Sequence, residues 1–154
     1  MSVQNKESFS SEEIKIAFEQ YKLYVEMADR VSQRRMSANT FFTTVNTLLF
    51  TIAAFIGSKD VTWILFIGVV GCVISFAWYF TLNSYRQLNA GKFAVINEIE
   101  KILPLSGFSY EWAILGHGDK KQKYWPISHV EKIIPTIFFI AYIVLATGKL
   151  ISLS

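Results

Sequence analysis

The chain has 154 residues, of which 52% are hydrophobic, 16% are aromatic and 18% are charged, and its formal net charge is +3. Soluble domains usually carry about a quarter of charged residues, so this composition excludes an ordinary soluble domain and indicates a membrane protein. The acidic residues are nearly as numerous as the basic ones, so the charge is no sign of nucleic-acid binding.

Residues 1–9 are predicted to be a disordered N-terminus, followed by a cytoplasmic amphipathic helix over residues 10–40. Ser10 followed by Glu13 is a capping-box pattern. Spacings of four and three residues then form one packing seam, made of Ala17, Tyr21, Tyr24, Ala28 and Val31. No Pro or Gly interrupts the chain from Ser10 to Ile56, so we expect one long helix, or two nearly collinear ones, entering the membrane.

Three segments are candidates for crossing a bilayer, which takes about 17–25 predominantly apolar residues. They are residues 41–57, 61–82 and 133–150. The second carries no charge and has Trp63 near one end and Trp78 near the other, where headgroups would lie. Only the residues 58–60 separate the first two segments, so we expect a tight helical hairpin.

The second span is predicted to continue as a cytoplasmic helical extension over residues 83–104. Leu88, Val95, Ile99 and Ile102 keep a helical spacing up to Pro104. We expect this extension to pack antiparallel to the helix over residues 10–40. Residues 105–132 are predicted to be a structured cytoplasmic loop that contains a short strand or a turn of helix.

The distribution of Lys and Arg predicts the orientation in the membrane. Of the 15 basic residues, all except Lys59 and Lys149 fall in the N-terminal segment or in residues 83–132. By the positive-inside rule, the N-terminus lies in the cytoplasm and the C-terminus outside. The predicted fold is therefore an all-α integral membrane protein with three transmembrane helices and a small cytoplasmic domain built from the helical extensions.

The first span carries an unusual set of polar residues on one face. At about 100° per residue, Thr44, Thr47 and Thr51 lie within about 40° of Thr40. We interpret this face either as a helix interface, within or between subunits, or as a surface that lines water in an oligomer. The residues of this predicted interface or pore lining are Asn39, Thr40, Thr43, Thr44, Asn46, Thr47 and Thr51.

Two further groups of residues are predicted to have structural roles. Small residues in the second span are expected to allow close helix packing: Gly68, Gly71, Cys72 and Ser75. Charged residues near the membrane are expected to form a cytoplasmic charge network or to contact lipid headgroups: Asp29, Arg30, Arg34, Arg35, Arg86 and Lys92. Glu98 and Glu100 are candidate partners in this network, and plain positive-inside topology is the alternative.

Catalytic and metal-binding patterns are absent from the sequence. His117, His129 and the single cysteine, Cys72, do not have the spacing of a zinc site. No nucleophile, phosphate-loop or metalloprotease motif is present. We therefore expect no enzyme activity, no cofactor and no metal, with a lipid-handling enzyme that uses His117 or Asp119 as the weakest alternative.

Three stretches of the chain, residues 21–47, 78–104 and 110–142, together resemble the RipA-like family of small bacterial inner-membrane proteins. The most distinctive positions are Asp29, Arg30, Arg34, Arg35, Asn39, Trp78, Tyr85, Arg86, Asn89, Lys92 and Phe93. The resemblance implies a multi-pass protein of the bacterial inner membrane that forms an octamer and has no established enzyme activity.

The residues and the resemblance agree on a homo-oligomer, because the polar face and the packing seam both need further surfaces. Subunits that share one membrane orientation are expected to form a cyclic ring. We predict a ring-shaped scaffold or regulator with a cytoplasmic interaction domain, and the alternative is a pore or channel lined by the Asn/Thr face. The expected partners are other copies of the chain, membrane lipids and a cytoplasmic protein, but not nucleic acid.

Overall fold

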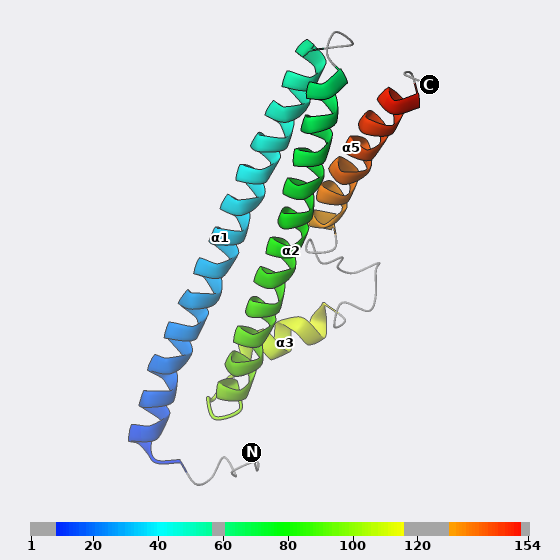
Figure 1. Ribbon diagram of the computed structural model, residues 1–154. Coiled ribbons are helices and arrows are strands. Elements are labelled where there is room, and N and C mark those ends of the chain that lie inside the picture. Colours follow the sequence, from blue (N-terminus) through cyan, green and yellow to red (C-terminus); the bar gives the residue numbers. More distant parts are fainter. Residues whose placement is uncertain (1–8, 57–60, 116–129, 152–154) are drawn as a thin grey trace. The chain divides into compact units, whose positions relative to one another are not determined.

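The structure is a computed structural model that describes residues 9–56, 61–115 and 130–151. These residues form helices and no strand (Figure 1). The helices are α1 (Ser11–Ile56), α2 (Val61–Glu100), α3 (Gly107–Ile114) and α5 (Ile133–Ile151). The predictions for residues 1–8, for the hairpin turn at 58–60 and for half of the loop over 105–132, namely residues 116–129, fall outside the described residues.

The chain divides into two compact units, and α1 and α2 contribute to both. The first, called the α5 unit, comprises Arg34–Tyr85 and Ile127–Ser154. The second, called the α3 unit, comprises Met1–Gln33 and Arg86–Pro126. Each unit is described by itself.

Helix α1 begins with the predicted capping box. The backbone N–H of Ser10 donates to Glu13 Oε2 at 2.8 Å, and the backbone N–H of Glu13 donates to Ser10 Oγ at 3.3 Å. These bonds satisfy two N–H groups that have no partner within the helix. Helix α1 is 46 residues long and continuous. Of the two possibilities that the sequence left open, one long helix or two nearly collinear helices, the structure has the first.

Helix α2 ends at Glu100, before Pro104, through a tightened final turn. The backbone N–H groups of Lys101, Ile102 and Leu103 each donate to the carbonyl three residues earlier. Such bonds satisfy the last carbonyls of a helix, and Pro104 then prevents its continuation. Helix α3 follows, so the described part of this region contains a helix where the sequence left a short strand or a turn of helix open.

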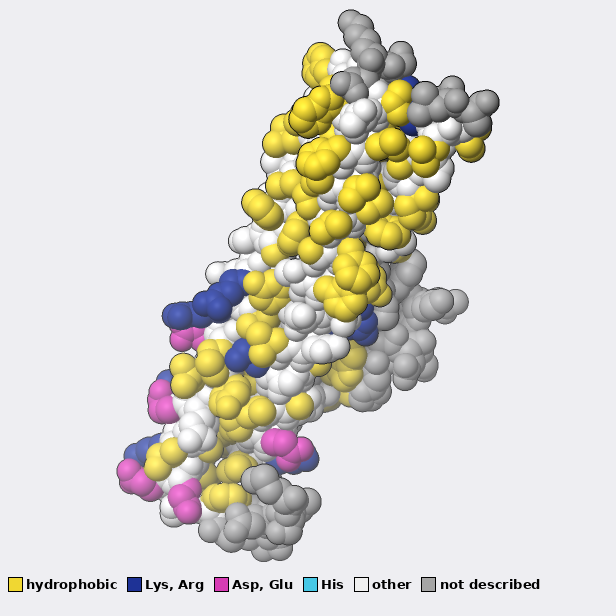
Figure 2. All heavy atoms as spheres, viewed as in Figure 1, with side chains coloured by type: hydrophobic (Ala, Val, Ile, Leu, Met, Phe, Trp, Pro, Cys, Tyr) yellow, Lys and Arg dark blue, Asp and Glu magenta, His cyan; other side chains and the backbone are white. Residues whose placement is uncertain are grey.

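In the α5 unit, α1, α2 and α5 pack with alternating directions. Asn39 contacts Trp78, whereas Asn46, further along α1, contacts Ser75, so α1 and α2 are antiparallel. The core contains Ala53, Ile67 and Tyr142. On the face shown in Figure 2, hydrophobic side chains cover much of this unit.

In the α3 unit, α1 and α2 also pack antiparallel, since Tyr21 contacts Glu100 and Met27 contacts Lys92. The predicted seam of α1 is confirmed by the burial of Ala17, Ala28 and Val31. On the part of α2 in this unit, Ile96 and Glu100 are buried, as is Leu103 just after the helix, whereas Leu88 and Val95 are exposed. The spacing of Leu88 and Val95 thus indicated the helix but not its buried face.

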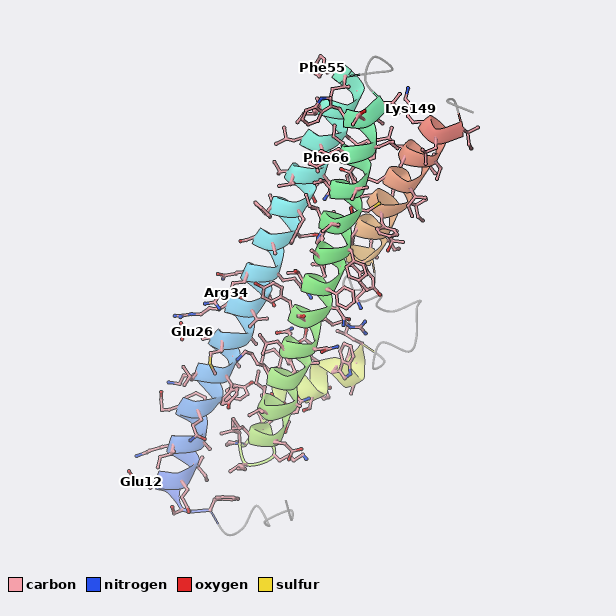
Figure 3. The ribbon with its side chains drawn as sticks, in the orientation of Figure 1. Glu12, Glu26, Arg34, Phe55, Phe66 and Lys149 are labelled. Carbon is pink, nitrogen blue, oxygen red and sulfur yellow. The ribbon has the colours of Figure 1, made fainter. Side chains whose placement is uncertain are left out.

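Three helices, α1, α2 and α5, are long and apolar enough to cross a membrane by length and composition. The residues exposed on α2 and α5 within the α5 unit include many large hydrophobic side chains. Among them are Phe66, Val69, Val73, Phe76, Ile137, Ile140 and Val144. Figure 3 shows Phe66 at the surface of α2.

Candidate functional site: the polar face of α1

Asn39 lies inside the α5 unit, next to a buried tryptophan. The indole N–H of Trp78 donates to Asn39 Oδ1 at 3.0 Å. The Trp78 side chain is fully buried and stacks on Phe42, with ring centroids 5.9 Å apart and planes 10° apart. Because a buried indole N–H without an acceptor is costly, Asn39 provides what Trp78 needs to pack between helices.

Asn46 is fully buried and connects all three helices of the α5 unit. Its side-chain amide donates to the Phe42 carbonyl at 2.8 Å, and its Oδ1 accepts from Ser75 Oγ at 3.2 Å. The Tyr142 hydroxyl donates to the Asn46 backbone carbonyl at 3.2 Å. Within a membrane, polar groups need such partners because lipid supplies none.

The threonines of the predicted face are exposed on α1. Each hydroxyl donates to the carbonyl four residues earlier, at distances of 2.8 to 3.1 Å. These residues are Thr40, Thr43, Thr44, Thr47 and Thr51. The hydroxyl hydrogens are therefore used within α1, and the face needs no water or partner to satisfy them.

The structure thus divides the predicted polar face into two parts. Asn39 and Asn46 contact α2 and α5 of the same subunit, whereas the threonine side chains are exposed and bond to their own helix. The sequence placed the residues around one helix but did not indicate on which side the neighbouring helices lie.

The small residues of α2 lie against α5 and α1. A Cβ built on Gly68 would lie 3.2 Å from Ala146 Cβ, and one built on Gly71 would overlap the ring of Tyr142. Cys72 Sγ lies 3.9 Å from the Phe139 carbonyl oxygen. Close approach of α5 to α2 therefore depends on the absence of side chains at the two glycines.

The candidate charged residues have several different partners. Arg30 pairs with Glu26 at 2.7 Å on the exposed surface of α1, and Asp29 accepts from Gln33 at 2.8 Å. Arg35 Nε pairs with Glu131 Oε2 at 3.5 Å, and both side chains are mostly buried. The first ion pair contributes little to stability because water screens it.

The remaining basic residues are arranged differently again. Arg34 is exposed and points away from α2, as Figure 3 shows, and Arg86 is half-buried. Lys92 Nζ lies 3.8 Å from Met27 Sδ and 5.9 Å from the centroid of the Tyr24 ring.

Glu100 is a functional candidate of the α3 unit whose role the sequence did not reveal. It is fully buried, and it pairs with none of the basic residues proposed as its partners. Its carboxylate accepts from the backbone N–H groups of Phe108 and Ser109 at 2.8 and 3.0 Å, and from the Tyr21 hydroxyl at 3.1 Å. Glu100 therefore caps the N-terminus of α3, where a negative charge is favoured.

The surroundings of Glu100 shift two pKa values in opposite directions. Burial raises the pKa of Glu100, but the hydrogen bonds from Phe108, Ser109 and Tyr21 outweigh it and hold the pKa below its usual value. Burial, the hydrogen bond to Glu100 and its negative charge raise the pKa of Tyr21. The carboxylate thus stays ionised, and the phenol protonated, at neutral pH.

In the part of the chain that the structure describes, no group of three or more His, Cys, Asp or Glu residues has an arrangement suited to a metal ion. His117, Asp119 and His129 lie outside that part. The described geometry therefore gives helix packing, capping and exposed faces rather than a constellation of reactive groups.

Comparison with known proteins adds the family. The sequence profile of the octameric membrane protein family (8xMP) matches residues 18–151. The chain belongs to this family. No curated protein and no solved structure gives a significant match. Membership of the octameric membrane protein family and the three long apolar helices together identify an oligomeric membrane protein.

Proposed function

We propose that the protein is a homo-octameric, ring-shaped scaffold of the bacterial inner membrane. Its N-terminus and α3 unit lie in the cytoplasm, its C-terminus lies outside, and the α3 unit recruits or regulates other proteins. Support comes from the family description, from the apolar helices and from the concentration of Lys and Arg on one side of the spans. The resemblance to the RipA-like family supports the inner-membrane location.

The observation that carries the scaffold proposal is the satisfaction of the α1 polar groups within the subunit. Asn39 and Asn46 bond to Trp78 and Ser75, and the exposed threonine hydroxyls bond to their own helix. A face of this kind presents methyl groups and small side chains, which favour close approach of a neighbouring helix. We therefore assign the threonine face of α1 to a contact between subunits.

Large exposed hydrophobic side chains occur on α1 as well, such as Phe41 and Leu48, but they are more numerous on the outer surfaces of α2 and α5. Their exposed side chains in the α5 unit are large and branched or aromatic, such as Phe66, Val73 and Ile140. Such side chains suit contact with lipid chains, because they need no polar partner. The assignment is therefore α1 to the neighbouring subunit, and α2 and α5 to membrane lipid.

The oligomeric state is tested by native mass spectrometry of the protein in lipid nanodiscs. A mass of eight chains supports the proposal, and a monomer or dimer contradicts it. The environment of α1 is tested by spin labels at Thr44→Cys and Thr47→Cys in a Cys72→Ala background, with Val69→Cys on α2 as the matched lipid-facing control.

The environment of each spin label is measured by its collisions with two reagents. Oxygen partitions into lipid, whereas a nickel chelate stays in water. Low accessibility to both reagents at Thr44 and Thr47 supports a subunit interface. High accessibility to nickel identifies a water-lined axis and favours a pore over the scaffold. High accessibility to oxygen, as expected at Val69, places the face against lipid and refutes the assigned contact.

A further inference from the structure

The α3 unit exposes two separate hydrophobic faces. The first, called the α3 face, consists of Leu105, Tyr110 and Ile114. Leu105 is 76% exposed and Tyr110 is 68% exposed, and Ile114 follows Tyr110 by one helical turn. No residue of α3 is buried. The α3 face therefore leaves a large part of the apolar surface of this region exposed in the single subunit.

The second, called the α1–α2 face, consists of Ile16 and Leu23 on α1 and Leu88 and Val95 on α2. Ile16 and Leu23 are each 54% exposed, and Leu88 is 51% exposed. The two helices are joined beside this face by Lys92, which lies against Met27 and Tyr24. On the face of the molecule shown in Figure 2, hydrophobic side chains of this unit lie among the charged ones.

The two faces lie on opposite sides of the α3 unit. Tyr21 on α1 and Glu100 on α2 mark the side that holds α3, because both contact it. At about 100° per residue, Ile16 and Leu23 lie roughly 140–160° around α1 from Tyr21. By the same arithmetic, Val95 lies roughly 140° around α2 from Glu100. The α1–α2 face therefore points away from α3.

The two faces also lie at a similar level along the helices. The hydrogen bond between Tyr21 and Glu100 places these residues side by side, and Glu100 contacts the first turn of α3. At 1.5 Å per residue, Ile16, Leu23 and Val95 all lie within about 8 Å of this level along the helix axes, whereas Leu88 lies about 18 Å from it, at the far end of the α1–α2 face. A rotation about an axis parallel to the helices thus brings one face against the other without a vertical shift.

We infer that the α3 face of one subunit docks on the α1–α2 face of the next subunit, so that the α3 units form a closed ring. This inference rests on the proposed octamer. Copies that share one membrane orientation are related by rotation about the membrane normal, and their contacts join two different faces at the same level. The α3 face and the α1–α2 face lie on opposite sides of one unit and so meet this requirement. In the ring, the α3 face of each subunit covers the α1–α2 face of the next.

A second copy fits these faces better than a lipid surface does. The exposed ion pair of Lys22 and Glu19 lies at the level of Tyr21, with 2.6 Å between Nζ and Oε1. Charged side chains of this kind belong in water, which places the surrounding surface outside the hydrocarbon region. Contiguous hydrophobic faces exposed to water mark sites of association between proteins.

The test is disulfide formation between the two faces in the intact oligomer in nanodiscs. Leu23→Cys and Tyr110→Cys are combined in a Cys72→Ala chain and oxidised with copper phenanthroline. We expect a ladder of cross-linked species up to eight chains on a denaturing gel. Each single cysteine alone is expected to give no ladder, because the contact joins two different residues. Lys22→Cys with Tyr110→Cys is the matched control, since Lys22 points about 100° away from Leu23.

Each outcome has a defined meaning. A mass of eight chains without a ladder from the Leu23–Tyr110 pair overturns the inference and leaves the octamer standing. Dimers from Leu23→Cys alone show that the α1–α2 face meets its own copy, which also overturns the inference. A mass below eight chains contradicts the proposed function itself, whatever the cross-linking result.

Discussion

Among the glycines that the structure describes, Gly71 has the least room for an added side chain. A Cβ at this position would overlap Cε1 and Cζ of Tyr142. The Tyr142 ring is fully buried, stacks on Phe50 at a centroid distance of 4.5 Å, and bonds to the Asn46 carbonyl through its hydroxyl. The ring cannot turn aside without losing both contacts, so Gly71→Ala is expected to separate α5 from α2.

The expected magnitude combines three effects. Overpacking typically costs about 1–3 kcal/mol, and loss of the Tyr142 hydrogen bond costs about 1 kcal/mol. The higher helix propensity of alanine relative to glycine offsets about 1 kcal/mol of this loss in stability. The net result for Gly71→Ala is a loss of about 1–3 kcal/mol of unfolding free energy, measured by steric trapping in bicelles.

The structure supplies a graded set of controls for this experiment. Gly148 is also in a candidate membrane helix, and a Cβ there meets no atom within 4 Å, so Gly148→Ala is expected to be neutral or stabilising. Gly68→Ala, at 3.2 Å from Ala146 Cβ, is expected to fall between the two. In the double variant Gly71→Ala, Tyr142→Leu, the losses should add to less than the sum of the single losses. Equal stability of Gly71→Ala and Gly148→Ala would refute the reasoning.

Two other predictions concern buried polar groups. Replacement of Glu100 by Gln should weaken the docking of α3 at neutral pH by about 1.5–3 kcal/mol, because bonds to a charged acceptor are lost. Since the pKa of Glu100 is lowered in the folded state, its stabilisation is present above the ordinary carboxyl pKa of about 4.3 and is lost as the pH falls through the folded pKa. Hydrogen exchange of the α3 amides at several pH values measures the docking of α3, and Glu98→Gln, at an exposed glutamate, is the control. The difference in exchange between Glu100→Gln and the unmodified protein should disappear at low pH. A difference that persists unchanged at low pH would contradict the prediction. Asn46→Leu and Ser75→Ala should show a coupling of about 0.6–1.7 kcal/mol in a double-mutant cycle of unfolding free energy, as expected for a hydrogen bond between membrane helices, and zero coupling would mean that the bond contributes nothing.

The helices themselves were predictable because their determinants are local. The capping box joins Ser10 and Glu13, three residues apart, and the unbroken α1 follows from the absence of Gly and Pro between Ser10 and Ile56. The apolar spans follow from the length of hydrocarbon that a helix must cross. The seam that contains Ala17, Ala28 and Val31 was also predictable, since a helix repeats its faces every three to four residues.

The candidate site was predictable only in part. A helical wheel gives the angles between Asn39, Asn46 and the threonines, but it does not give the direction of the neighbouring helices. That direction depends on contacts with Ser75, 29 residues from Asn46, and with Trp78, 39 residues from Asn39. The division of one polar face into inward amides and outward hydroxyls therefore needed the packed structure.

The other properties of the protein also divide into those that the sequence determines by itself and those that only the tertiary structure decides. Composition and hydropathy by themselves determined an all-α membrane protein, because a bilayer accepts only segments that satisfy their own backbone and bury apolar side chains. The tertiary structure decided that Glu100 caps α3, with Tyr21 contributing a hydrogen bond from 79 residues away. It also decided that Ile96 is buried while Leu88 and Val95 are exposed. A hydrophobic residue looks the same in a sequence whether it faces its own subunit or the next, and only the placement of the surrounding helices distinguishes the two.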